Sequence, residues 1–205
     1  MRANRRRRVR WCLGGVLGLL IWGGLSGTGA EERLQEEAQK GRWLFPPGRI
    51  EWGAQAGGGF ALSDYATPLL SLGARVGYVL TEQEVLLRGS LEIVGEPSYF
   101  AVVHGRAAHG GDLSALLKYN FWTGTKLTPY LIGGAGLSYA SIRVPQGGTN
   151  FNFTIQTGIG LHYALSERGT LNLEWRYHHF SNGDIVPPNP SLNTSLFLLG
   201  FSVLY

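Results

Sequence analysis

The sequence predicts an all-β fold, an eight-stranded antiparallel transmembrane β-barrel of the bacterial outer membrane. Three observations predict it: segments of 10–13 residues alternate between apolar and polar positions, charged residues are few at 16%, and aromatic residues reach 12%. Transmembrane strands need about 9–11 residues, and an even number of alternating strands is typical of outer-membrane barrels.

The sequence predicts three parts: a secretory signal peptide at 1–30, a periplasmic lead-in at 31–48 and the barrel at 49–205. Six arginines lie among the first ten residues, and residues 11–25 are apolar. Residues 26–30 are small, which suits cleavage after Ala30. This is the pattern of a signal peptide. The alternative is an uncleaved anchor, but the apolar stretch is shorter than the about 20 residues that a spanning helix needs.

Charge and cysteine content narrow the function classes. The chain has a net charge of +4, yet residues 31–205 carry 12 basic and 14 acidic side chains. Nucleic-acid binding, which needs a basic face on the folded domain, is therefore disfavoured. The only cysteine is Cys12, so the predicted mature chain has neither a disulfide nor a cysteine-based zinc site. We expect no cofactor and no metal.

Eight segments show the period of two that places alternate side chains on opposite faces of a strand. In chain order they are residues 50–60, 70–80, 84–94, 112–121, 128–140, 151–163, 171–181 and 195–205. The facing of 128–140 is ambiguous. In the other segments the apolar face is carried in turn by Ile50 and Trp52, Leu70 and Val76, Leu87 and Ile93, Leu113 and Phe121, Phe151 and Ile159, Leu173 and Trp175, and Phe197 and Phe201.

The connections alternate in length, as an outer-membrane topology requires. The second, fourth and sixth are fairly short, at 81–83, 122–127 and 164–169, whereas we expect long connections at 96–111 and 182–192. The chain ends on an aromatic residue, as outer-membrane barrels commonly do.

The faces opposite the apolar ones carry charge. A soluble β-sandwich or lipocalin-like barrel also alternates, but it would bury these charges in a packed interior. An apolar outside and a charged inside suit a barrel surrounded by lipid. Eight strands enclose a space just wide enough for side chains, so we expect no diffusion pore. The charged residues are Glu51, Arg75, Arg88, Glu92, Lys118, Glu174 and Arg176.

The candidate chemistry lies at the end of the seventh segment. His179 and Ser181 are two residues apart, so they project from one face, the apolar one. Serine becomes nucleophilic when a neighbouring base takes its proton, and a neutral imidazole can do so. His178 should point inward. With a periplasmic N-terminus, this strand ends at the cell surface, beside lipopolysaccharide in the outer leaflet.

A longer motif surrounds the pair. It resembles the lipid A 3-O-deacylase family of outer-membrane barrels, and the specific match covers about residues 174–205. In that family the asparagine of a Pro-Asn pair lies seven residues after the asparagine of a His-x-Ser-Asn motif. The matching residues here are His179-Phe180-Ser181-Asn182-Gly183 and Pro188-Asn189-Pro190.

The resemblance implies a serine esterase that removes the 3-O-linked 3-hydroxyacyl chain from lipid A. It assigns Ser181 as the nucleophile and His179 as the base. It also implies that Asn189 helps to hold the oxyanion, with Asn182 or backbone amides near Gly183 assisting. The implied partners are lipid A and the outer membrane, and the sequence leaves open whether the barrel forms a homodimer.

One position departs from the family pattern. The best-matched enzymes place an acid four residues after the Pro-Asn asparagine to orient the histidine, and this sequence has Asn193 there. An amide can accept the imidazole hydrogen bond, as in Cys-His-Asn sites, but stabilises an imidazolium less well. Asp184 and Glu174 are alternative acids, although Glu174 should point inward.

Two other functional hypotheses remain. In the first, the chain is a non-enzymatic small barrel of structural or adhesion type, and His179 and Ser181 are interfacial polar residues. In the second, Asn193 makes the chain a catalytically weakened relative.

Overall fold

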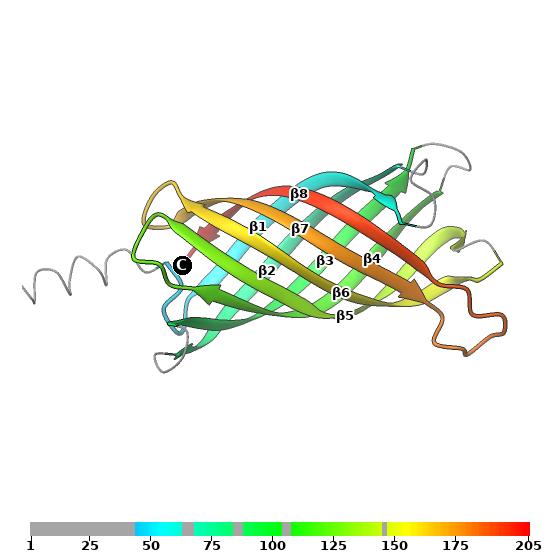
Figure 1. Cartoon of the computed structure of the whole chain (residues 1–205), viewed down its shortest axis with the longest axis horizontal. Helices are drawn as coiled ribbons and strands as arrows, with labels where there is room; N and C mark the ends of the chain where they lie inside the picture. The colour runs from blue at the N-terminus through cyan, green and yellow to red at the C-terminus, as the bar shows by residue number, and fades with distance from the viewer. Residues whose placement is uncertain (1–43, 63–67, 84–87, 104–107, 145–146) are drawn as a thin grey trace, which may run out of the picture. The chain divides into compact units, whose positions relative to one another are not determined.

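The computed structural model describes residues 44–62, 68–83, 88–103, 108–144 and 147–205. They form a closed barrel in which each strand pairs antiparallel with its chain neighbours and β1 pairs with β8, so the predicted fold is confirmed. Figure 1 shows the strands tilted across the long axis of the barrel. The strands are β1 (Ile50–Ala61), β2 (Pro68–Gln83), β3 (Gly89–Val102), β4 (Ala108–Phe121), β5 (Leu127–Val144), β6 (Thr149–Ala164), β7 (Gly169–Ser181) and β8 (Leu192–Leu204).

We call the end where β1 begins and β8 ends the proximal end, and the opposite end, which carries the β7–β8 loop, the distal end. The predicted signal peptide and most of the predicted lead-in lie outside the described residues. Among the residues that are described, no helix is long and apolar enough to cross a membrane.

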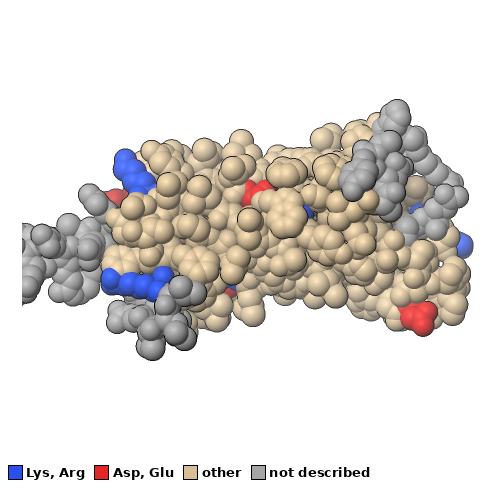
Figure 2. Space-filling model, viewed as in Figure 1, with Lys and Arg blue, Asp and Glu red and all other residues tan. Residues whose placement is uncertain are grey.

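Alternation along the strands gives the barrel an apolar outside. Exposed leucines, isoleucines and aromatic residues cover the wall. On the face seen in Figure 2, few charged side chains lie between the two ends of the barrel. The ambiguous segment is resolved as well: in β5, Leu131 and Leu137 face outward, while Tyr130 and Ile132 face inward.

The expected long connection at 96–111 is wrong. β3 continues through Pro97, and only residues 103–107 separate β3 from β4. Proline has no N–H to donate to a ladder. The pairing of β3 with β2 skips Glu96 and Pro97, while Pro97 still lies opposite Leu113 of β4. The strand tolerates the proline because one of its two neighbours is locally unpaired.

The predicted start of the third strand at residue 84 is also corrected. Residues 84–87 lie outside the described residues, and β3 begins at Gly89. Arg88, expected inside the barrel, therefore lies exposed at the proximal rim. Its guanidinium carbon lies 3.0 Å from the centre of the Trp122 ring, a cation–π contact that replaces the expected interior ion pair.

The other predicted interior charges form two buried groups. In the first, Lys118 contacts Glu51 and lies 2.9 Å from Glu92. In the second, Arg75 lies 2.8 Å from Glu96 and 3.1 Å from Glu174, and Arg176 contacts both of these carboxylates. Pairing each charge offsets the cost of removing it from water.

Apolar clusters occupy both ends of the interior, a feature that alternation alone does not predict. At the proximal end, Leu44 and Phe45, which precede β1, pack against Val79 and Leu204. At the distal end, Phe100 and Phe180 belong to one cluster, and their rings lie 5.9 Å apart.

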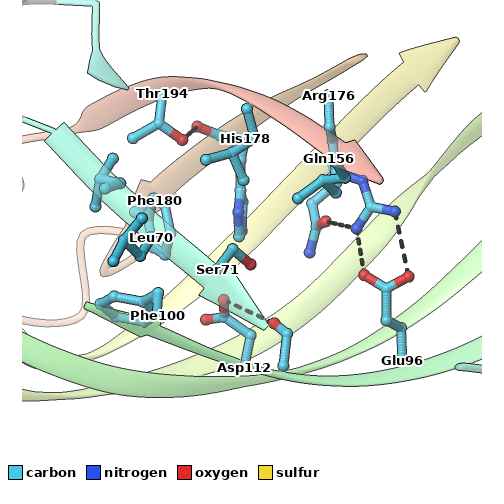
Figure 3. A pocket seen from close by; sticks show the side chains of 14 residues that line it. Leu70, Ser71, Glu96, Phe100, Asp112, Gln156, Arg176, His178, Phe180 and Thr194 are labelled. Carbon is cyan, nitrogen blue, oxygen red and sulfur yellow. Dashed lines mark hydrogen bonds and ion pairs between the residues drawn. The ribbon is translucent and has the colours of Figure 1, made fainter. Parts of the chain in front are cut away.

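A small interior pocket lies next to the distal cluster. Figure 3 shows His178 and Asp112 pointing into it, with the ion pair between Arg176 and Glu96 alongside. Side chains therefore fill much of the lumen, as eight strands require.

Candidate active site

The last residues of β7 alternate between the interior and the wall as the sequence predicts. His178 and Phe180 are buried inside, with exposed fractions of 4% and 6%. Tyr177, His179 and Ser181 are half-buried and share the outer face. The predicted outward direction of the imidazole and the hydroxyl is therefore confirmed.

Asn193 lies directly beside the imidazole. The register places His179 opposite Asn193 of β8, and Nδ1 of His179 lies 2.7 Å from Oδ1 of Asn193. An amide oxygen can only accept, so Nδ1 carries the hydrogen in this contact. Nε2 is then the ring nitrogen with a free lone pair, as a general base requires.

Ser181 ends β7 and pairs with Phe153 of β6. Residues two apart on one face are separated by about 7 Å along the strand, a span that the serine and histidine side chains can bridge. Among the described residues, the Ser181 hydroxyl has no hydrogen-bond partner, so it can rotate toward His179. Catalytic hydrogen bonds are often loose before substrate binds.

The loop after Ser181 is organised by Asn182, which is 4% exposed. Its Nδ2 donates to the carbonyl oxygens of Val186 at 2.7 Å and Pro188 at 3.3 Å. Its Oδ1 accepts from the Asp184 amide at 2.9 Å. These contacts make the Asn182 side chain a support for the loop, with both of its polar atoms engaged.

Gly183 begins the turn of that loop. It has a φ of +64°, a backbone conformation that suits glycine. A Cβ at this position would lie 3.1 Å from the ring of Phe153. Glycine thus allows the loop to leave β7 close to the wall of β6.

Asn189 lies against the backbone of the residue that follows Ser181. Its Oδ1 accepts a hydrogen bond of 3.0 Å from the Asn182 amide. This contact fixes which end of the side-chain amide faces the strand, so Nδ2 is the end that can still donate to a bound group. The structure thus brings Asn189 to the same short stretch as Ser181.

The two alternative acids lie elsewhere. Glu174 is 2% exposed inside the barrel, and its carboxylate contacts Arg75 and Arg176. Asp184 is exposed in the β7–β8 loop. Asn193 is therefore the residue that orients the imidazole in this structure.

Tyr177 is a site residue that sequence reasoning missed. Its hydroxyl donates to Oδ1 of Asn193 at 2.7 Å, the same oxygen that His179 contacts. The position of Tyr177 two residues before His179, on the same face, was a usable signal. Its acceptor on β8 could not be inferred without the register.

An apolar groove of about 440 Å³ lies on the outer wall nearer the middle of β7. Ile159, Leu173, Trp175 and Phe197 contribute to its lining. Trp175 donates from Nε1 to the Ser195 hydroxyl at 2.8 Å, which anchors the indole on the wall. The described residues hold no group of three or more His, Cys, Asp or Glu side chains suited to a metal.

A closed eight-stranded barrel, apolar outside and charged inside, with polar side chains gathered at one end of its wall, defines an outer-membrane β-barrel. The family model for Lipid A 3-O-deacylase (PagL) matches residues 41–202. The chain belongs to this family.

Solved structures support the fold. The outer-membrane enzyme PagL matches with a TM-score of 0.60 and 18% identity, over 73% of this chain and 97% of that chain. Neisserial surface protein A matches with a TM-score of 0.56 and 17% identity, over 76% and 95%. The N-terminal barrel of Pseudomonas aeruginosa OprF matches with a TM-score of 0.52 and 20% identity, over 78% and 98%. No curated protein matches the sequence.

Proposed function

We propose that the chain is an outer-membrane serine esterase that removes the 3-O-linked 3-hydroxyacyl chain from lipid A. The observation that carries the proposal is the 2.7 Å contact between His179 and Asn193 on the outer wall, with Ser181 two residues further along the same face. Membership of the lipid A 3-O-deacylase family supplies the substrate class.

In the first half of the reaction, Oγ of Ser181 attacks the ester carbonyl while Nε2 of His179 takes its proton. Asn193 accepts the Nδ1 hydrogen and keeps the ring in place. Negative charge develops on the carbonyl oxygen, where Nδ2 of Asn189 and backbone amides near Gly183 would stabilise it. The ester C–O bond then breaks, and His179 returns the proton to the departing sugar hydroxyl.

In the second half, water attacks the acyl-serine ester. His179 takes a proton from that water and passes it to Oγ of Ser181 as the carbonyl–Oγ bond breaks. The products are the free 3-hydroxy fatty acid and the original enzyme. Each step uses groups of this chain and water, and no redox change occurs.

The surroundings of the site suit a lipid substrate. With a periplasmic N-terminus, β7 runs outward and the distal end stands at the cell surface, so Ser181 would meet lipid at the outer-leaflet interface. The apolar groove on the wall offers a surface for an acyl chain. A non-enzymatic barrel has no need for an outward imidazole held by an amide, so the His179–Asn193 contact favours the esterase.

The test is mass spectrometry of lipid A from Gram-negative cells that express the wild-type chain, Ser181→Ala or Ser141→Ala at equal levels. Ser141 is a matched control because it is another serine on the outer face near the distal end, where it is exposed. We expect wild type and Ser141→Ala to yield lipid A that lacks one 3-hydroxyacyl chain, and Ser181→Ala to leave it intact.

Fragment ions assign the lost chain to position 3 or to another position. Identical lipid A from wild type and Ser181→Ala would contradict the proposal. A fluorophosphonate probe, which labels activated serines, provides a second readout: it should label wild type and spare Ser181→Ala and His179→Ala.

A further inference from the structure

A second, polar pocket lies at the distal end, between the β5–β6 hairpin and the β7–β8 loop. Its volume is about 280 Å³. Arg143 and residues 147–150 line one side, and residues 186–188 line the other. We call it the distal pocket. Its size suits a small polar group rather than a whole lipid.

Arg143 gives the distal pocket its charge. It is exposed near the end of β5, and within the described ranges it is the only lysine or arginine at the distal end. No ion pair among the described residues involves Arg143. A guanidinium presents several N–H donors in a planar fork, a geometry that matches phosphate oxygens.

The pocket wall opposite Arg143 is tied to the proposed active site. Asn182, the residue after Ser181, donates to the carbonyl oxygens of Val186 and Pro188 at 2.7 and 3.3 Å. Asn189, the proposed oxyanion donor, follows this wall directly in the chain. A group held in the distal pocket would therefore rest on the same loop that shapes the surroundings of Ser181.

The wall on the Arg143 side is also held firmly. Asn150 donates from Nδ2 to the Ala140 carbonyl at 2.9 Å, which ties β6 to β5 beside the pocket. Thr149 lies four residues beyond Phe153, the partner of Ser181, or about 13 Å along the strand. The pocket thus lies at the rim beyond the hydroxyl, within reach of the head of a lipid whose ester is at Ser181.

We propose that the distal pocket binds a phosphate group on the sugar head of the lipid substrate, with Arg143 as its main ligand. The proposal rests on the proposed deacylase function, because lipid A carries phosphate esters on its glucosamine sugars. Arg143 is then a specificity-determining residue: it holds the head at the rim while the acyl ester lies at Ser181.

The test compares two substrates and two variants of the full-length protein in detergent micelles. The substrates are bisphosphorylated lipid A and the same lipid A after phosphatase treatment. The variants are Arg143→Gln and Arg168→Gln. Arg168 is a matched control, because it is an exposed arginine in the β6–β7 turn at the proximal end.

We expect Arg143→Gln to raise KM for phosphorylated lipid A by about 10-fold, the effect of losing one charge-assisted contact, with little change in kcat. On dephosphorylated lipid A, Arg143→Gln should equal wild type, and Arg168→Gln should equal wild type on both substrates. No change on phosphorylated lipid A, or an equal loss on both substrates, would overturn the proposal.

A binding measurement separates this proposal from the esterase itself. Ser181→Ala and the double variant Ser181→Ala/Arg143→Gln are titrated with each lipid. A phosphate site predicts weaker binding of the double variant to phosphorylated lipid A alone. If wild type cleaves neither lipid, the esterase proposal fails, and this comparison still decides whether Arg143 binds phosphate. Equal affinities of the two proteins for phosphorylated lipid A would refute the site.

Discussion

The hydroxyl of Tyr177 lies 2.7 Å from Oδ1 of Asn193, and the imidazole of His179 lies at the same distance from that oxygen. Two donors thus converge on a single amide oxygen between β7 and β8. The tyrosine holds Asn193 in the position from which it orients the imidazole.

Replacing Tyr177 by Phe should lower kcat for lipid A by about 3- to 10-fold with little change in KM, because one hydrogen bond of about 1 kcal/mol that positions Asn193 is lost. Deacylation kinetics in micelles measure this. Tyr139→Phe is the control, since Tyr139 is an outward tyrosine with 64% exposure. Equal rates for Tyr177→Phe and wild type would show that the hydroxyl does not support the reaction.

A carboxylate at position 193 should accelerate the reaction. Glutamate stabilises an imidazolium through its charge, which an amide does only weakly, and we expect Asn193→Glu to raise kcat by about 10-fold or more. Asn193→Gln has the same length without the charge and serves as the control. Should both variants show the same rate, the charge at this position has no catalytic effect, and the weakened-relative hypothesis loses its basis.

Lys118 should be essential to the stability of the barrel. Its side chain is fully buried and contacts both Glu51 and Glu92. Lys118→Ala leaves these carboxylates without their cation and should reduce the free energy of unfolding by about 3–5 kcal/mol. Urea unfolding in lipid vesicles measures the loss. Lys126→Ala, at an exposed turn, should have almost no effect, and a comparable loss there would contradict the explanation.

Gly160 should not tolerate a methyl group. A Cβ there would overlap the ring of Tyr130, whose hydroxyl donates to Glu174 at 2.8 Å. We expect Gly160→Ala to lower the free energy of unfolding by about 1–3 kcal/mol through overpacking. Gly95→Ala is the control, because the nearest atom would lie 4.0 Å away. Similar unfolding curves for the two variants would argue against a steric cause.

The fold was predictable because a period of two is a strong signal in this chain. Strand count, the outward pair on β7 and most inward charges follow from alternation alone. The length of the connection before β4 was not predictable in this way, because a proline in the sequence usually indicates the end of a strand. Spacing along one strand predicted that His179 and Ser181 share a face, and the family resemblance put Asn193 at the position that orients the histidine. The contacts of Asn193 depend on the β7–β8 register, which the intervening loop sets.

The interior also shows a limit of pattern-based prediction. Tyr130 and Ile132 face inward although they are large and mostly apolar, so hydrophobicity alone assigned their segment to neither face. Leu44 and Phe45 lie before the first strand, where alternation carries no information. Their place at the proximal end depends on the shape of the space that eight strands enclose.

Because His179 and Ser181 stand on the convex wall of a cylinder, any lipid they accept arrives sideways, by diffusion in two dimensions. The encounter rate then depends on the number of lipid molecules per unit area of membrane, and not on their molar concentration. Diluting the lipid with inert detergent, at constant total amount, slows such an enzyme. Under the proposed function, the released fatty acid would stay in the leaflet where the ester was cleaved, next to the protein.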